Sequence, residues 1–158
     1  MSELDLVGAH YQKILFCTDF SDNAKEAFKE AVKATAHKGA EICLFHVIPE
    51  PDAQFWKGYI YEVGDMDTKA RNNIDRAVEK YYQPLVPEGV RFLVSVRIGE
   101  VAHSILEYVG EYGADLLVMG RQGHGAITRW LLGNVTEKVV RKAACPVLVV
   151  PMELVSGE

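Results

Sequence analysis

Five short apolar runs, separated by segments with helical periodicity, constrain the fold of this chain more than any other feature. The runs are KILFCTD (13–19), EICLFHVIP (41–49), VRFLVSVRIG (90–99), DLLVMG (115–120) and PVLVVP (146–151). Such runs are typical of strands that are buried on both faces of a parallel sheet. The polar residues and prolines that follow them mark the points where the strands end.

Each of the four intervals contains a stripe of apolar residues at helical spacing. The first stripe comprises Ala24, Ala27, Phe28, Ala31, Val32 and Thr35, behind a predicted N-cap at Ser21. The second comprises Met66, Ala70, Ile74, Ala77, Val78 and Tyr81. The third comprises Val101, Ile105, Leu106, Val109 and Tyr112, closed by Gly113, and the fourth comprises Val135, Val139, Val140 and Ala143. Residues 50–64, which contain four aromatic side chains, predict a loop or short-turn insertion that covers the core or a partner surface.

Strands that alternate with helices predict a single doubly wound α/β domain over residues 1–158, with its core at about 11–151. We expect a five-stranded parallel sheet, helices on both faces and right-handed crossovers. A strand order of 3-2-1-4-5 is adopted as a postulate, because it places the two chemically interesting strand ends side by side.

Composition excludes several classes of protein. A net charge of −5 and a pI of about 5.6 disfavour non-specific binding to nucleic acid or anionic membranes. No apolar run approaches the roughly 20 residues that span a bilayer, and the N-terminus is unlike a signal peptide, so we expect a cytoplasmic protein. Cys17, Cys43 and Cys145 lack the spacing of a disulfide framework or zinc site and are predicted to be reduced packing residues.

Two strand ends carry the polar residues expected of a ligand site. Thr18 and Asp19 follow the first strand, and the loop GRQGHGAITRWLLGN (120–134) follows the fourth. Gly120 and Gly123 would allow close approach of an anion and a positive φ, and Gly133 precedes a helix N-terminus, which binds phosphate well. Arg121 and Arg129 could add charge. The alternative is that the glycines form only a tight connection between strand and helix.

The order and spacing of these motifs resemble the universal stress protein (UspA) family. Gly120, Gly123 and Gly133 are similar to its G-2x-G-9x-G(S/T) signature, and KILFCTDFSDNA, LFHVI and ACPVLVVP resemble its first, second and last strands. The similarity runs from about residue 11 to residue 151. It implies an adenine nucleotide alpha hydrolase-like fold, a crevice for ATP, ADP or AMP with Mg²⁺ on the phosphates, and a homodimer formed through the C-terminal strand.

The resemblance assigns a role to each matching position. Asp19 would face the ribose or base, with Cys17 and Thr18 lining the same turn, and the backbone of Val47 would read adenine. Ribose and phosphates would be bordered by Met119 and Gly120, in a loop that continues through Arg121 and Gln122. The implied phosphate contacts are Gly123, Gly133, Asn134, Val135 and Thr136.

Asn134 departs from the family signature, which has Ser or Thr at this position. Its amide can still donate to phosphate, but Asn134 with Glu137 three residues later is also typical of a helix N-cap. Both interpretations remain open.

Three functions therefore compete. The first is an ATP-binding stress-response switch or sensor with an unknown protein partner. It would have little or no hydrolysis, because the sequence contains no recognisable catalytic triad or general base. The second is a dimeric interaction module that no longer binds nucleotide. The third, an enzyme such as a nucleotidyl transferase, usually needs a further substrate domain.

Overall fold

The computed structural model describes residues 11–35, 39–49, 60–121 and 134–152, and for residues 60–67 it describes the backbone alone. Its five strands form one parallel sheet in the order β3-β2-β1-β4-β5, which confirms the postulated order. The strands are β1 (Lys13–Cys17), β2 (Glu41–Pro49), β3 (Arg91–Gly99), β4 (Leu116–Gly120) and β5 (Val147–Val150). The order reverses between β1 and β4, where Phe16 pairs with Val118.

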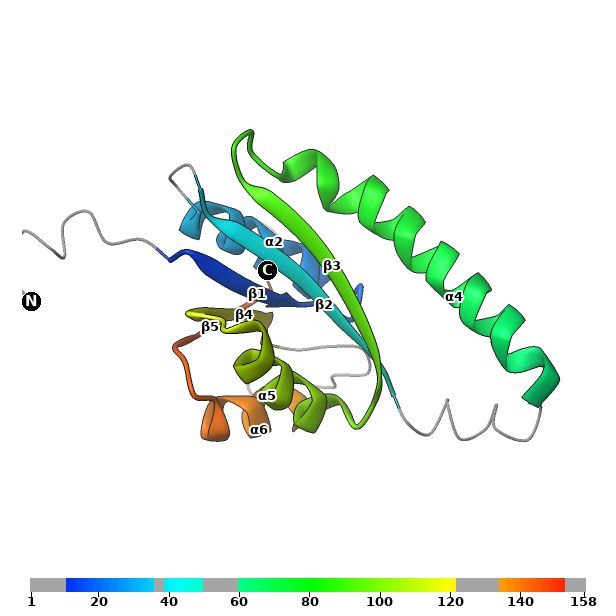
Figure 1. Cartoon of the computed structure of the whole chain (residues 1–158). Coiled ribbons are helices and arrows are strands. Elements are labelled where there is room, and N and C mark those ends of the chain that lie inside the picture. The colour runs from blue at the N-terminus through cyan, green and yellow to red at the C-terminus, as the bar shows by residue number, and fades with distance from the viewer. Residues whose placement is uncertain (1–10, 36–38, 50–59, 122–133, 153–158) are drawn as a thin grey trace, which may run out of the picture.

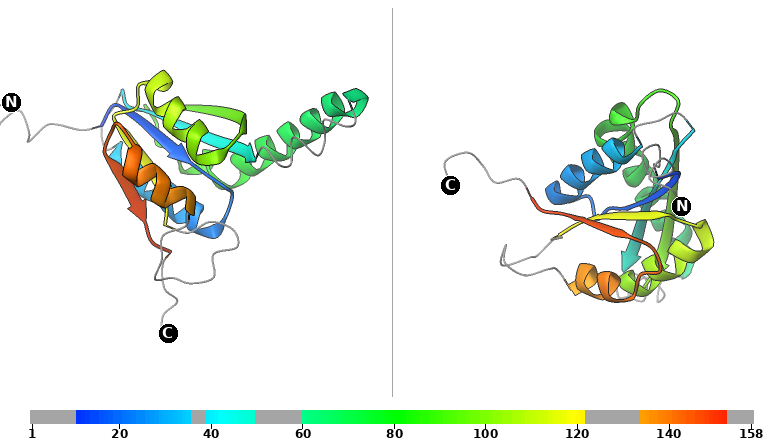
Figure 2. Two further views of the ribbon diagram at one scale, coloured as in Figure 1. Left: turned by 90° about the horizontal axis from the view of Figure 1, so that it is seen from below. Right: turned by 90° about the vertical axis from the view of Figure 1, so that its left-hand side faces the viewer.

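Helices cover both faces of the sheet (Figures 1 and 2), as the sequence predicts. The helices are α2 (Asp22–Ala34), α4 (Ile60–Tyr81), α5 (Val101–Tyr112) and α6 (Asn134–Lys142), and a short 3-10 helix, η1 (Gln83–Leu85), follows α4. One core lies between the sheet and the helices α2 and α4, and it contains Ile14, Phe16 and Phe28. The other lies against α5 and α6 and contains Leu15, Leu117 and Val139. This alternation of neighbouring strand residues between the two cores is the period of two that a strand dictates.

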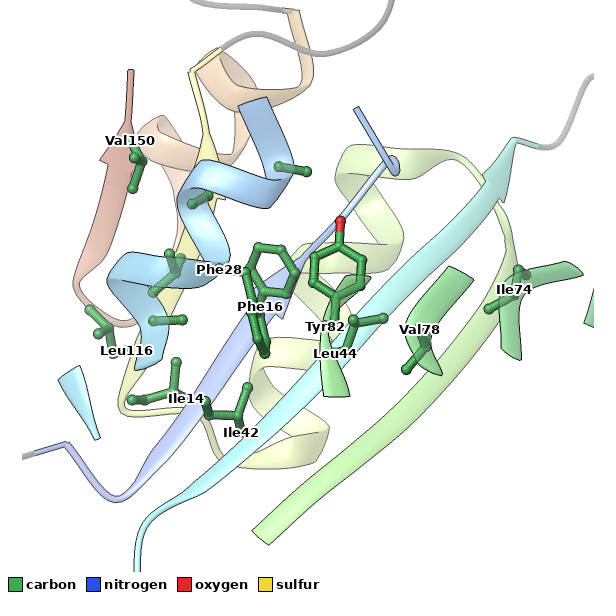
Figure 3. Close-up of a cluster of buried hydrophobic side chains, with 14 of the residues drawn as sticks. Ile14, Phe16, Phe28, Ile42, Leu44, Ile74, Val78, Tyr82, Leu116 and Val150 are labelled. Atoms are coloured by element: carbon green, nitrogen blue, oxygen red, sulfur yellow. The ribbon is translucent and has the colours of Figure 1, made fainter. Parts of the chain in front are cut away.

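The helix α4 differs from its prediction at both ends. It begins at Ile60, so the predicted loop over 50–64 is wrong for residues 60–64, while residues 50–59 lie outside the described part. Ile74 and Val78 of α4 are buried, as is Tyr82, the residue that follows the helix (Figure 3). Tyr81, which the prediction placed in the apolar stripe, is 40% exposed.

The other helices follow their predictions closely. Ser21 caps α2 by accepting a hydrogen bond from the Ala24 amide, and Gly113 closes α5 in the left-handed conformation with a φ of 76°. Glu100 is the N-cap of α5 and accepts from the amides of Ala102 and His103. In α6 the prediction of Val140 as a core residue is wrong, because its side chain is exposed while Val139 is fully buried.

Candidate nucleotide-binding crevice

The predicted site residues of β1 and β4 come together at the carboxyl edge of the sheet. Because Phe16 pairs with Val118 in a parallel ladder, Cys17 lies beside Met119 and Thr18 lies beside Gly120. The side chains of Cys17 and Met119 are buried against α5 and α6, so they form the floor of this region. Asp19 and Arg121, which follow these two strand ends, are half-buried at the same edge of the sheet.

The turn between β1 and α2 is ordered by its own polar side chains. The Phe20 amide donates to Thr18 Oγ1 at 2.9 Å, and the Ser21 amide donates to Asp19 Oδ1 at 3.0 Å. Both bonds close over two residues, which is the usual way that Asp and Thr shape a turn. The Asp19 carboxylate is thereby fixed, half-buried, at the strand end.

Residues from β2 and α4 also hold this turn. His46 Nδ1 donates to the Thr18 carbonyl at 2.8 Å, and the Tyr82 hydroxyl lies 2.8 Å from Thr18 Oγ1. Burial lowers the pKa of His46, which keeps the ring neutral with its proton on Nδ1. The sequence analysis gave no role to Tyr82, whose only signal was its position four residues after Val78.

The end of β2 extends past Cys17, the last residue of β1 that pairs with it. The Thr18 amide donates to the Phe45 carbonyl, so the Phe45 backbone faces β1. Val47, two residues further, points its amide and carbonyl to the same side, beyond Cys17, the last residue of β1 that pairs with β2. These are the groups that the family resemblance assigns to adenine.

Gly120 is required by a close approach from α2. A Cβ atom built on Gly120 would lie 3.0 Å from the side chain of Asn23, which is itself buried and donates to the Val150 carbonyl at 2.9 Å. The backbone of Gly120 does not have a positive φ, so that part of the prediction is wrong for this glycine. Gly123 and Gly133 lie outside the described residues, as do Gln122 and Arg129.

Arg121 brings a cation to the end of β4. Its amide donates to the Val150 carbonyl at 2.8 Å, which fixes its backbone against β5. Its Nε is buried and has no hydrogen-bond partner within the part of the chain that the structure describes. Since a buried, unpaired guanidinium N–H is costly, this atom is suited to an acceptor that is supplied from outside the protein.

The N-terminus of α6 is fastened to the same strand end. Thr136 is buried and its Oγ1 donates to the Gly120 carbonyl at 3.0 Å, so its hydroxyl proton is used within the protein. Val135 packs partly against the core beneath α5 and α6. Asn134 is the first helical residue, which puts the N-cap position one residue earlier, outside the described part, instead of on Asn134 itself.

Charge is distributed unevenly among the three helix N-termini that follow β1, β3 and β4. Asp22 lies in the first turn of α2, and the Glu100 carboxylate already occupies the amides that begin α5. An anion would be repelled at those two positions. The first turn of α6 also contains an acidic residue, Glu137, but its carboxylate is paired with Arg141 at 2.9 Å. Arg121 lies at the end of the adjoining strand and adds a cation beside this helix N-terminus.

The three cysteines are free, and burial raises the pKa of each thiol. A raised pKa leaves little reactive thiolate at neutral pH. Among the described residues there is also no group of three or more His, Cys, Asp and Glu side chains that could hold a metal ion. None of the helices in the described ranges has the length and apolar character needed to cross a membrane.

Comparison with known proteins agrees with the fold. The universal stress protein MJ0531 of Methanocaldococcus jannaschii is 31% identical over 146 residues, which are 89% of this chain and 82% of that protein. The solved structure of MJ0577 from the same organism is 28% identical, with a TM-score of 0.77 over 93% of this chain and 100% of its own. A universal stress protein solved in complex with cAMP is 25% identical, with a TM-score of 0.59 over 92% of this chain and 100% of its own.

The model of the universal stress protein family matches residues 10–151, which include every strand and helix described above. With the shared strand order and the relatives, this match shows that the chain belongs to the universal stress protein family.

Proposed function

We propose that the crevice binds an adenine nucleotide, with ATP preferred, and that the protein acts as a stress-response switch or sensor with little or no hydrolysis. The observation that carries this proposal is the buried Nε of Arg121, which has no hydrogen-bond partner among the described residues, beside the anchored N-terminus of α6. Both features favour phosphate, and both lie across the strand ends from Asp19. The complex of a related universal stress protein with cAMP supports an adenine nucleotide as the ligand.

The nucleoside would lie on the β1–β2 side of the crevice. The fixed carboxylate of Asp19 suits the hydroxyls of a ribose, and the backbone amide and carbonyl of Val47 suit the edge of adenine. Cys17, Thr18 and Met119 supply the floor on which these groups are held.

The phosphates would lie on the β4–α6 side. Gly120, Arg121 and the first turn of α6, with Asn134, Val135 and Thr136, would border them, together with Gln122, Gly123 and Gly133 from the undescribed segment. Thr136 would act by holding the helix N-terminus, because its hydroxyl donates to Gly120. Mg²⁺ would be carried on the phosphate oxygens, where it neutralises their charge.

Little hydrolysis is proposed because the titratable groups near the strand ends are used for structure. Asp19 accepts a hydrogen bond from the Ser21 amide, and His46 donates its Nδ1 proton to the Thr18 carbonyl. General-base catalysis needs a group within hydrogen-bond reach of the attacking water, with a pKa near neutrality.

Calorimetric titration with ATP, ADP, AMP and GTP tests the proposal. We expect saturable binding of ATP, weaker binding of AMP and GTP, and a loss of about tenfold or more in ATP affinity for Arg121→Gln, because hydrogen bonds to charged groups are worth about 1.5–3 kcal/mol. Arg91→Gln is the matched control, since Arg91 lies at the start of β3, where its exposed side chain pairs with the largely buried Glu41. Absence of saturable binding at millimolar ATP would instead favour an interaction module without nucleotide.

A further inference from the structure

Tyr82 joins the end of α4 to the proposed nucleoside side of the crevice. Its side chain is fully buried, with ring centroids 5.0 Å from Phe28 and 5.6 Å from Phe16. Figure 3 shows the ring among these apolar side chains and the hydroxyl pointing away from them. That hydroxyl lies 2.8 Å from Thr18 Oγ1, which is 64 residues away in sequence.

Thr18 is the point at which three parts of the fold meet. Its hydroxyl bonds to Tyr82 and accepts from the Phe20 amide, and its carbonyl accepts from His46 on β2. The next residue is Asp19, whose carboxylate the proposed function places against the ribose. A change in the Tyr82 bond is therefore passed directly to the backbone that positions Asp19.

The turn is held in a conformation that a bulky residue rarely adopts. Phe20 has a φ of 63°, in the left-handed region that disfavours a large L side chain. Its ring lies 4.7 Å from His46 and 6.1 Å from Tyr82, between centroids, and its amide is bonded to Thr18. Backbone strain of this kind persists only where the surrounding contacts impose it, and it is relieved when they are removed.

The helix α4 meets the sheet through a limited part of its length. Ile74 and Val78 are its buried side chains within the region where side chains are described, and they lie near its C-terminal end. Figures 1 and 2 show α4 beside the β3 edge, with its N-terminal end reaching past the sheet. The position of its last turns is thus fixed by a few apolar contacts and by the Tyr82 hydroxyl.

We infer that Tyr82 is a positioning residue, and that its bond to Thr18 links the position of α4 to occupancy of the crevice. The inference rests on the proposed nucleotide binding. Because such linkage is reciprocal, nucleotide that orders the Asp19 turn also orders the end of α4, and a partner that moves α4 changes nucleotide affinity.

The test compares Tyr82→Phe with Tyr81→Phe by hydrogen exchange and calorimetry. In the wild type, ATP slows exchange in peptides covering residues 17–21 and 74–82. Tyr82→Phe keeps the ring and hence the core, but it binds ATP about tenfold more weakly and loses the ATP-dependent protection of 74–82. Tyr81→Phe makes the same chemical change on a ring that is exposed between Lys25 and Lys80, and it leaves both measurements unchanged.

Two further variants change Thr18, the other residue in the bond. Thr18→Ser retains the hydroxyl and the linkage, whereas Thr18→Val loses the protection of 74–82. Adding Tyr82→Phe to Thr18→Val produces no further loss, because Thr18→Val already removes the Tyr82 bond together with the bond from the Phe20 amide.

The outcomes separate this inference from the proposed function. If the wild type binds no ATP, the proposed function fails, and the linkage inference, which rests on it, fails as well. If the wild type binds ATP and Tyr82→Phe matches it in affinity and in protection of 74–82, the inference is overturned while nucleotide binding stands.

Discussion

At the scale of single residues, the carbonyl of Val150 holds together the ends of β4 and β5 and the start of α2. It accepts from Asn23 Nδ2 at 2.9 Å and from the Arg121 amide at 2.8 Å, so it ties α2 and the end of β4 to β5. Gly120 makes room for the Asn23 side chain in this arrangement. The first glycine of the signature is thus explained by packing, which a sequence pattern cannot distinguish from a need for a positive φ.

Gly120→Ala is expected to lower the free energy of unfolding by about 1–3 kcal/mol, the usual cost of overpacking. The new methyl group would meet Asn23 at 3.0 Å, and Asn23 cannot withdraw without losing its bond to Val150. Urea denaturation measures the change. Gly110→Ala is the control, because a Cβ at Gly110 meets nothing within 4 Å in the interior of α5, so that variant should be as stable as the wild type or more stable. Equal stability of the two variants would contradict the packing explanation.

The lowered pKa of His46 predicts that the folded state loses stability in mild acid. Burial lowers the pKa of His46 in the folded state below its ordinary value of 6.5. The unfolded chain therefore takes up the proton first as the pH falls, and the folded state loses stability from about pH 6.5 down to the folded pKa.

His46→Asn keeps an N–H donor for the Thr18 carbonyl and removes the titration, so its unfolding free energy should fall less between pH 7 and pH 5. His103→Asn removes an exposed histidine and should retain the slope of the wild type. A wild-type slope in His46→Asn would show that another group is responsible.

At the scale of elements, apolar periodicity predicted every strand and the core-facing sides of α2 and α5. It failed at the ends of α4 for two physical reasons. Helical spacing continues the stripe of Ile74 and Val78 to Tyr81, but α4 ends at that residue, and the buried ring belongs to Tyr82, in the turn that leads to η1. At the other end, Gly64 has a low helix propensity and stands among aromatic residues, a composition that favours a loop in the sequence although Gly64 lies inside the helix.

The anchor between α6 and β4 gives a prediction at this scale. Thr136→Val conserves the shape of the side chain but leaves the Gly120 carbonyl without its hydroxyl donor. We expect a loss of about 1 kcal/mol in the free energy of unfolding, or more if that carbonyl stays buried without a partner. Thr136→Ser keeps the hydroxyl and should lie close to the wild type. If Thr136→Val and Thr136→Ser have the same stability in thermal and urea denaturation, the bond does not anchor the helix.

At the scale of the whole molecule, the sequence predicted where the site lies better than how it is held. Strand order alone brings Thr18 and Gly120 together, because ligand sites in open α/β sheets lie where that order reverses. The bonds that hold the site join Thr18 to His46 and Tyr82, and Asn23 to Val150, over 28, 64 and 127 residues. Such contacts leave no periodic signal, so only the folded chain reveals them.

The edge of the sheet that β5 forms gives a prediction about assembly. β5 is an edge strand, and Leu148 on it is 38% exposed. An exposed apolar edge strand is suited to pairing with a second copy. We expect light scattering to show a dimer for the wild type and a monomer for Leu148→Glu. Leu93→Glu is the control, because Leu93 is 39% exposed on β3, the opposite edge strand. A monomeric wild type, or a monomer produced only by Leu93→Glu, would exclude assembly through β5.

The central claim is that the two strand ends bind the two halves of one adenine nucleotide. Amide chemical shifts of the labelled protein, followed during titration with ATP and Mg²⁺, test it most directly. The account predicts saturable shifts at Thr18, Asp19 and Val47 on one side and at Arg121 and Asn134 on the other, with little change at the start of β3. Unchanged spectra at millimolar ATP, or shifts confined to another surface, would contradict it.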